Sequence, residues 1–162
     1  MPKALRFSGI IAAILVIGAQ FFGPAKTNPP PDPAQSAYST LEMPPAVASA
    51  LQRSCTDCHS NDTRWPWYTS VAPVSWWTID HVNHGRSHLN FSEWGKLSPE
   101  GALHMLSEIC EQIERGDMPL PSYLRMHGDA RLSLEDRKSI CLWTVTQRNK
   151  LSGKPAEHQQ HK

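Results

Sequence analysis

Residues 55–59 bring together side chains whose types and spacing could carry covalent chemistry. The string reads Cys55-Thr56-Asp57-Cys58-His59. Two thiols three positions apart can reach the two vinyl groups of one porphyrin, and the imidazole that follows can then coordinate the iron from below. The spacing therefore predicts one haem, attached covalently through Cys55 and Cys58 and ligated by His59.

Two other kinds of site use a pair of cysteines at this spacing. A structural zinc site needs four ligands and usually includes a second C-x-x-C pair, which the sequence lacks. A thioredoxin-type redox pair belongs to alternating strands and helices, and this chain shows no such alternation. Both alternatives are therefore weaker than the haem hypothesis.

The sixth coordination position of a haem iron decides what the protein does. Met118 stands in the string G-D-M-P, after a predicted helix and inside a long loop, where its thioether could fold over the other face of the ring. We expect Met118 to be the distal ligand. Met126, His127 and the histidines near residue 84 are the alternatives, whereas Met105 has the position of a core residue.

Other polar side chains are given a structural role. His81, His84 and His88 would line one helix face only if the helix continued past Gly85, so we expect solvated or capping imidazoles there. Cys110 and Cys141 would tend to join outside the cytosol, closing a loop of about 30 residues for about 3 to 4 kcal/mol of stabilisation. Two buried free thiols are the alternative.

Aromatic residues are dense between residues 65 and 94. Rings packed on a haem bury much area and exclude water, and indole, hydroxyl and guanidinium groups can hydrogen-bond its propionates. Ordinary core packing would explain the same composition. The residues predicted to contact the haem are Trp65, Trp67, Tyr68 and Arg86, with Arg64, Trp76, Trp77, Phe91 and Trp94 as weaker candidates.

The elements that must position these groups read as helices, and the predicted fold class is all-α. Apolar residues recur at helical spacing over about 45–54, 73–85, 98–115 and from 133 onward, and no segment alternates as a strand does. Ser98-Pro99 and Ser133 to Asp136 are good start signals, and Gly116 is a stop signal. We expect about four helices with long loops over 60–72 and 117–132, wrapped around the haem.

The chain divides into four segments by composition. Residues 1–25 resemble an export signal or a membrane anchor, because Lys3 and Arg6 precede an apolar run; residues 5–22 would enter the membrane if the segment is retained. Residues 26–44 are a proline-rich linker, either an extended spacer or a disordered connector. Residues 45–150 form the haem-binding domain, and 151–162 a flexible polar tail.

The overall charge argues against nucleic acid as a partner. The 162 residues include 16 Lys and Arg against 15 Asp and Glu, so there is no basic excess for binding phosphates. A two-domain enzyme is also unexpected at this length. Redox partner proteins are the expected partners.

Several strings together resemble the bacterial haem-binding domain family related to cytochromes c. They are C-T-D-C-H-S-N-D-T-R-W-P-W-Y, A-P-V-S-W-W, H-V-N-H-G-R, L-N-F-S-E-W, and G-D-M-P followed by Tyr123 and His127, within residues 47–148. The resemblance implies one c-type haem on Cys55, Cys58 and His59, and residence outside the cytoplasm. Met118-Pro119 resembles the distal methionine element of small cytochromes c, whereas the resemblance does not predict a bond between Cys110 and Cys141.

These observations together predict a periplasmic or membrane-anchored electron carrier with one covalent haem c and iron held between His59 and Met118. Such a protein transfers electrons and is not an enzyme in the strict sense. The alternatives are a haem enzyme or sensor whose distal position opens to peroxide or a gas, and a haem module docked on a larger redox complex.

Overall fold

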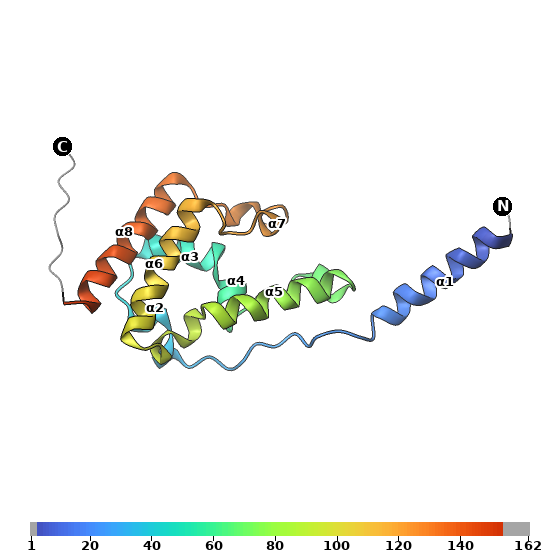
Figure 1. Cartoon of the computed structure of the whole chain (residues 1–162), viewed down its shortest axis with the longest axis horizontal. Coiled ribbons are helices and arrows are strands. Elements are labelled where there is room, and N and C mark those ends of the chain that lie inside the picture. Colours follow the sequence, from blue (N-terminus) through green and yellow to red (C-terminus); the bar gives the residue numbers. More distant parts are fainter. Residues whose placement is uncertain (1–2, 154–162) are drawn as a thin grey trace.

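The structure is a computed structural model that describes residues 3–153 of the chain. Every regular element in that range is a helix and none is a strand, which confirms the predicted all-α class (Figure 1). The predicted tail lies outside the described residues from residue 154 onward. The α-helices are α1 (Lys3–Ala19), α2 (Ala37–Thr40), α3 (Pro45–Ser54), α4 (Thr56–His59), α5 (Val74–His88), α6 (Pro99–Arg115), α7 (Pro121–Leu124) and α8 (Leu134–Leu151).

The described residues hold eight α-helices, more than the four or so expected. The four predicted segments correspond to α3, α5, α6 and α8. Helices α2, α4 and α7 are single turns, too short to show a period in the sequence. Four 3₁₀ helices complete the set: η1 (Pro33–Gln35), η2 (Trp67–Ser70), η3 (Phe91–Lys96) and η4 (Gly128–Ala130).

The start and stop signals of α6 and α8 act as predicted. The Ser98 hydroxyl accepts a hydrogen bond from the Gly101 N–H at the start of α6, and Gly116 ends that helix in the left-handed region with φ 75°. At the start of α8, Ser133 and Asp136 form a complete capping box. The loop that carries Met118 is therefore bounded by two well-defined helix ends.

The core forms where α6 and α8 lie side by side, with α3 and the η3 segment packed against them (Figure 1). Each helix contributes residues three or four positions apart, as an amphipathic helix must. The buried side chains include Val47, Ala50 and Leu51 of α3, Leu106, Ile109 and Ile113 of α6, Ile140 and Trp143 of α8, and Phe91 and Trp94 of η3.

The proline-rich segment 26–44 packs on the domain, which differs from the predicted spacer or connector. Ala37 and Leu41 are buried in the core. The Glu42 carbonyl accepts hydrogen bonds from the Trp143 indole at 3.0 Å and from the Gln147 amide at 2.8 Å. Proline content indicated an extended chain, but it could not show that the chain is pinned along the body. The folded unit therefore begins well before residue 45.

Helix α1 projects away from the body (Figure 1), and its large apolar side chains are exposed. This helix holds most of the segment predicted as an export signal or anchor. Within residues 3–153, no helix has both the length and the apolar character that crossing a membrane requires.

Candidate functional site

The C-x-x-C-H motif begins where α3 ends and forms the single turn α4. The Cys55 N–H still donates to Leu51 at 2.9 Å, and the His59 N–H donates to the Cys55 carbonyl at 3.0 Å. Neither Cys55 nor Cys58 is in a disulfide. The turn therefore leaves both thiols and the imidazole available to one ligand.

Cys55, Cys58 and His59 line one cavity of about 610 Å³, and Met118 lines it as well. This volume is within the range of ligand pockets, about 300–1,000 Å³. Met118 comes from the loop after α6, so a segment far away in sequence completes the cavity. The structure thus brings together the four residues predicted to hold the haem.

The hydrogen bonds of His59 define the state of its ring. Nδ1 lies 3.0 Å from the carbonyl oxygens of both Gly85 and Leu89. Because carbonyls only accept, Nδ1 carries the proton and Nε2 keeps its lone pair. Burial lowers the pKa of His59, although the two carbonyls act in the opposite direction. The neutral imidazole, with its Nδ1 fixed by backbone oxygen, is the form that binds a metal through Nε2.

Gly85 allows α5 to approach the C-x-x-C-H motif closely. The prediction that this helix ends at Gly85 is wrong. A Cβ at position 85 would lie 2.6 Å from the Cys58 carbonyl oxygen, closer than any real contact. The helix continues through Gly85 to His88. The glycine therefore serves close packing, although the sequence suggested a helix stop.

The cysteine thiols and a nearby hydroxyl fit the predicted haem. Burial raises the pKa of Cys55 to about 12 and that of Cys58 to about 11, so both are neutral thiols in the free chain. Ser54 Oγ is buried and has no hydrogen-bond partner within the described part of the chain, and Ser54 lines the same cavity. Two thiols, an imidazole with a free Nε2, a thioether and an unsatisfied hydroxyl suit a large, partly polar group.

Asp57, inside the motif, connects the attachment turn to the loop that carries Met118. Its buried carboxylate accepts from Arg64 Nε at 3.1 Å and from the Tyr123 hydroxyl at 2.7 Å. The Tyr123 ring stacks on His127, with ring centroids 4.1 Å apart. Sequence reasoning missed this network, because residues 57 and 123 share no pattern along the chain.

The predicted aromatic contacts lie mainly around a second cavity of about 310 Å³. Trp65, Trp67 and Tyr68 line this cavity and not the larger one. Four residues line both cavities, so the two are neighbours; these residues are Cys58, His81, Leu120 and Tyr123. Trp65, Trp67 and Tyr68 therefore adjoin the site, whereas Phe91, a weaker candidate, lines the cavity that holds Cys55, His59 and Met118.

Arg86, which was predicted to contact the haem, lines neither cavity. Its guanidinium donates to the Ser60 carbonyl at 2.7 Å, to the Thr27 carbonyl at 2.6 Å and to the Thr63 hydroxyl at 2.7 Å. Arg86 thus fastens the linker and the loop after the motif onto α5.

The histidines of α5 were expected to be solvated or capping groups; His84 and His88 are exposed, and all three also line the larger cavity. His81, His84 and His88 all contribute to its wall, together with His104 of α6. His88 belongs to the same helix because α5 continues past Gly85. Within residues 3–153, the one group of three potential metal ligands with donor atoms within 4.8 Å is Cys110, Glu114 and Cys141, which includes no residue of the C-x-x-C-H turn.

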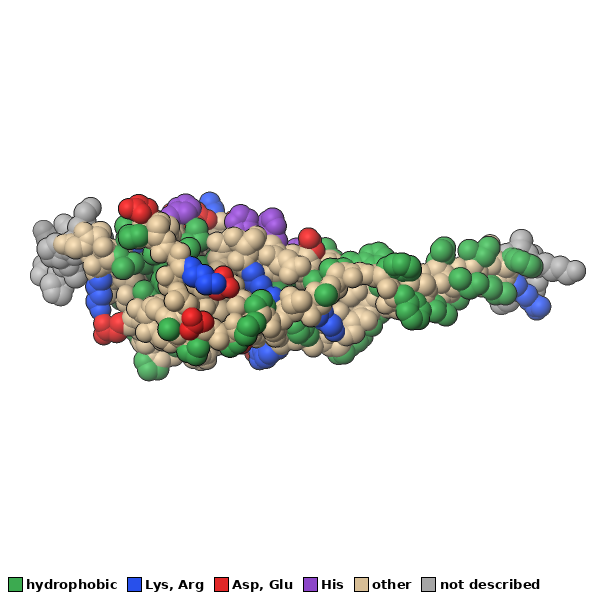
Figure 2. All heavy atoms as spheres, turned by 90° about the horizontal axis from the view of Figure 1, so that it is seen from below, with side chains coloured by type: hydrophobic (Ala, Val, Ile, Leu, Met, Phe, Trp, Pro, Cys, Tyr) green, Lys and Arg blue, Asp and Glu red, His purple; other side chains and the backbone are tan. Residues whose placement is uncertain are grey.

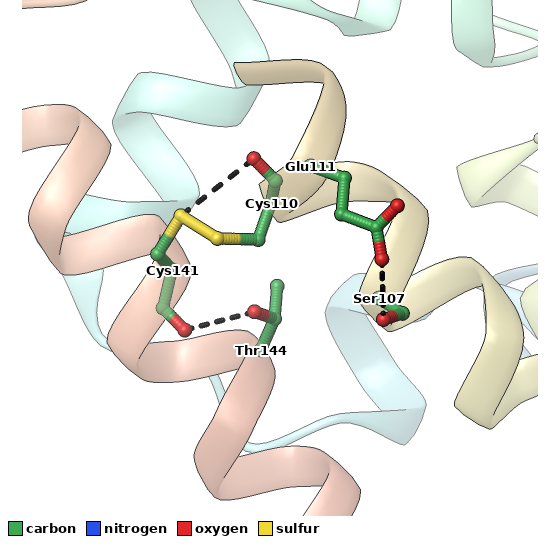
Figure 3. The surroundings of a disulfide bond; sticks show 5 residues. All are labelled: Ser107, Cys110, Glu111, Cys141 and Thr144. Carbon is green, nitrogen blue, oxygen red and sulfur yellow. Dashed lines mark hydrogen bonds between the residues drawn. A yellow bond between two sulfur atoms is a disulfide. The ribbon is translucent and has the colours of Figure 1, made fainter. Parts of the chain in front are cut away.

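Cys110 and Cys141 are joined by a disulfide between α6 and α8 (Figure 3). Their Cα atoms are 4.9 Å apart and 31 positions separate them in sequence. Because the two sulfurs are bonded to each other, they cannot bind a metal as thiolates. The bond ties together the two helices that flank the Met118 loop.

Comparison with known proteins gives one family. Residues 14–146 match the model of a family described as haem-binding domain. The match runs from inside α1 to inside α8, so it includes the C-x-x-C-H turn, the Met118 loop and the packed linker. No match was found among curated proteins or among solved structures.

Proposed function

Because the chain belongs to the haem-binding domain family, we propose that it holds one covalently attached haem c and carries electrons between partner proteins outside the cytoplasm. Family membership supports haem binding itself. The observation that carries the finer proposal is the single cavity lined by Cys55, Cys58, His59 and Met118.

In this proposal Cys55 and Cys58 attach the haem through thioethers, and His59 ligates the iron through Nε2. The backbone carbonyls of Gly85 and Leu89 hold the imidazole in one orientation and one tautomer. The neutral thiols of the free chain are weak nucleophiles, so attachment would depend on a maturation system.

Met118 is the proposed distal ligand. When bound, haem supplies one-electron exchange between ferrous and ferric iron, and a methionine ligand raises its reduction potential. The chain keeps the Met118 loop in place through the Tyr123–Asp57 hydrogen bond and through the disulfide between α6 and α8. A closed coordination shell suits electron transfer better than oxygen chemistry.

The histidines along the cavity favour a second candidate function. His81, His84, His88 and His104 add imidazole groups to the wall that Met118 shares. If the distal position opens, such groups could hydrogen-bond a peroxide or gas ligand, as in a haem enzyme or sensor.

Intact mass and spectroscopy test the proposal on protein made with a cytochrome c maturation system. We expect the polypeptide mass plus one haem, a near-infrared sulfur-to-iron band in the ferric protein, and no rapid binding of carbon monoxide by the ferrous protein. Met118→Ala should lose the band and bind carbon monoxide, whereas Met126→Ala, an exposed methionine outside the larger cavity, should do neither. A bare polypeptide mass contradicts covalent attachment, and rapid carbon monoxide binding by the unaltered protein favours the enzyme or sensor.

The proposed location is the periplasmic side of a bacterial envelope, with residues 5–22 as the anchor when the N-terminal segment is retained. The apolar, exposed α1 and the disulfide both suit an exported protein. When residues 1–44 are fused to a reporter enzyme, we expect activity from a reporter that functions outside the cytoplasm and none from one that functions inside it. N-terminal sequencing of the purified protein would show whether the N-terminal segment is cut.

A further inference from the structure

The end of the domain nearest α1 exposes a group of large apolar side chains, and we name this group the aromatic tip. It consists of Trp67, Val71, Val74, Trp76 and Trp77, which are 75%, 44%, 44%, 38% and 50% exposed. They follow one another over η2, the turn after it and the first turn of α5. An exposed cluster of this kind marks an interaction surface.

Helix α1 is attached to the aromatic tip. The Gln20 side chain, one residue past α1, accepts from the Ala72 N–H at 3.0 Å, and the Trp76 indole donates to the Phe22 carbonyl at 2.6 Å. Figure 2 shows hydrophobic side chains along α1 and again where that helix meets the body. The apolar surface of α1 therefore continues onto the domain.

The N-terminal segment that leads to this surface carries only basic charge. Residues 1–31 contain Lys3, Arg6 and Lys26 and no acidic residue, whereas Arg64, the one charged residue of 63–79, is paired with Asp57. Lys26 Nζ lies 2.6 Å from Ser70 Oγ, beside the tip. Lys26, a basic group beside the exposed tryptophans, complements the anionic headgroups of a lipid bilayer.

We propose that the aromatic tip contacts the surface of a lipid bilayer whose apolar layer receives α1. This inference depends on the anchoring part of the proposed function and not on the haem. Tryptophan is favoured at the membrane interface because an apolar ring and a polar N–H suit its two sides. At 17 residues, α1 is about 25 Å long against a hydrocarbon layer of about 30 Å, so it reaches into lipid with its C-terminal end close to the headgroups.

A second contact besides α1 would fix the orientation of the domain. A single helix followed by a flexible linker would let the domain turn freely, but segment 26–44 is packed on the body. With the tip on the bilayer, α5 runs from the membrane surface toward the C-x-x-C-H turn, which its Gly85 contacts. The larger cavity, which begins further along α5 at Asp80, would then stay at a set distance from the lipid.

Site-specific labelling of the full haem-loaded chain tests this. Cys110 and Cys141 are bonded, and Cys55 and Cys58 are consumed by haem in the proposed holoprotein, so Val71→Cys offers a single thiol for an environment-sensitive fluorophore. Leu142→Cys is the matched control, because Leu142 is an exposed apolar residue (69%) on α8, a helix that lies at the opposite end of the body from α1 (Figure 1). The unaltered chain, treated in the same way, gives the background from other thiols.

The labelled chains are mixed with protein-free vesicles of phosphatidylethanolamine and phosphatidylglycerol, with and without nitroxide-labelled lipid. On mixing with vesicles, we expect the fluorescence emission of the label at position 71 to shift to the blue. With nitroxide-labelled lipid, most of that emission should be quenched. The label at position 142 should show neither change. If the chain sediments with vesicles but the label at 71 behaves like that at 142, the inference is wrong and the anchor stands. If the chain does not sediment with vesicles, both the contact of the tip with lipid and the anchoring by α1 are wrong. If the label at position 71 is shielded from water only in native membranes, the tip contacts a protein partner instead.

Discussion

Replacing Gly85 by alanine tests the close approach of α5 to the C-x-x-C-H turn. The added Cβ would lie 2.6 Å from the Cys58 carbonyl oxygen and 3.3 Å from the Cys58 carbonyl carbon and Cβ. All three atoms belong to a residue held inside a helical turn, so no flexible side-chain end can move away. Either α5 or the turn must shift.

The size of the effect follows from three contributions to the free energy of unfolding. In an open helix, changing glycine to alanine stabilises by about 1 kcal/mol. Overpacking costs about 1–3 kcal/mol. Separating the two elements also weakens the hydrogen bond from His59 Nδ1 to the Gly85 carbonyl, worth about 1 kcal/mol. We therefore expect Gly85→Ala to lower the free energy of unfolding by about 1–3 kcal/mol.

Urea unfolding followed by circular dichroism measures this difference. Gly128→Ala is the matched control, because a Cβ there has no atom within 4 Å and the residue does not have a positive φ. The control should change stability by less than about 0.5 kcal/mol. A Gly85→Ala protein that is as stable as the parent, or more stable, would show that α5 is not pressed against Cys58.

Three further changes test the network, the disulfide and a helix start, each measured by urea unfolding. Tyr123→Phe removes a hydrogen bond to the buried Asp57 carboxylate and should cost about 1.5–3 kcal/mol. Joint replacement of Cys110 and Cys141 by serine should cost about 3–4 kcal/mol, because the unfolded chain loses its cross-link. Hydrogen bonds from Ser133 and Arg53 hold the pKa of Asp136 below its ordinary 3.8. The stability that this carboxylate adds is fully present above that value and is lost as the pH falls below it. The free energy of unfolding of Asp136→Asn should therefore decrease less on acidification than that of the parent chain.

The controls for these variants come from the same surroundings. Tyr68→Phe removes only a 3.4 Å contact with His127, so it should cost less than Tyr123→Phe; equal costs would contradict the importance of the Asp57 bond. A reducing agent should destabilise the parent chain and leave the double serine variant unchanged. If the free energy of unfolding decreases equally with falling pH in the parent and in Asp136→Asn, Asp136 does not contribute to the pH dependence.

The predictable parts of this protein are those encoded locally. The C-x-x-C-H spacing, the N-cap at Ser98, the stop at Gly116 and the start at Ser133 each depend on residues within one or two helical turns. The all-α class followed from four amphipathic segments; two of them, α3 and α6, match the structure closely at both ends, and α5 and α8 match at their starts.

The features that sequence reasoning missed depend on contacts between distant segments. Gly85 had the composition of a helix stop, but its role is set by Cys58 in another helix. The guanidinium of Arg86 could have bound a haem propionate, but it donates hydrogen bonds to the backbone carbonyls of residues 27 and 60. The linker looked extended because proline disfavours helices, and only the packed structure shows its backbone bonded to α8.

These distant contacts explain how a single helical turn can hold a metal ligand firmly. Helix α4 has four residues and cannot be stable alone. Its His59 is instead held by the C-terminal end of α5, where the carbonyls of Gly85 and Leu89 point at Nδ1. Carbonyl groups at a helix C-terminus carry partial negative charge, which favours the Nδ1–H donor and makes Nε2 a stronger ligand. The position of α5, made possible by the missing side chain of Gly85, therefore determines both the orientation and the basicity of the imidazole.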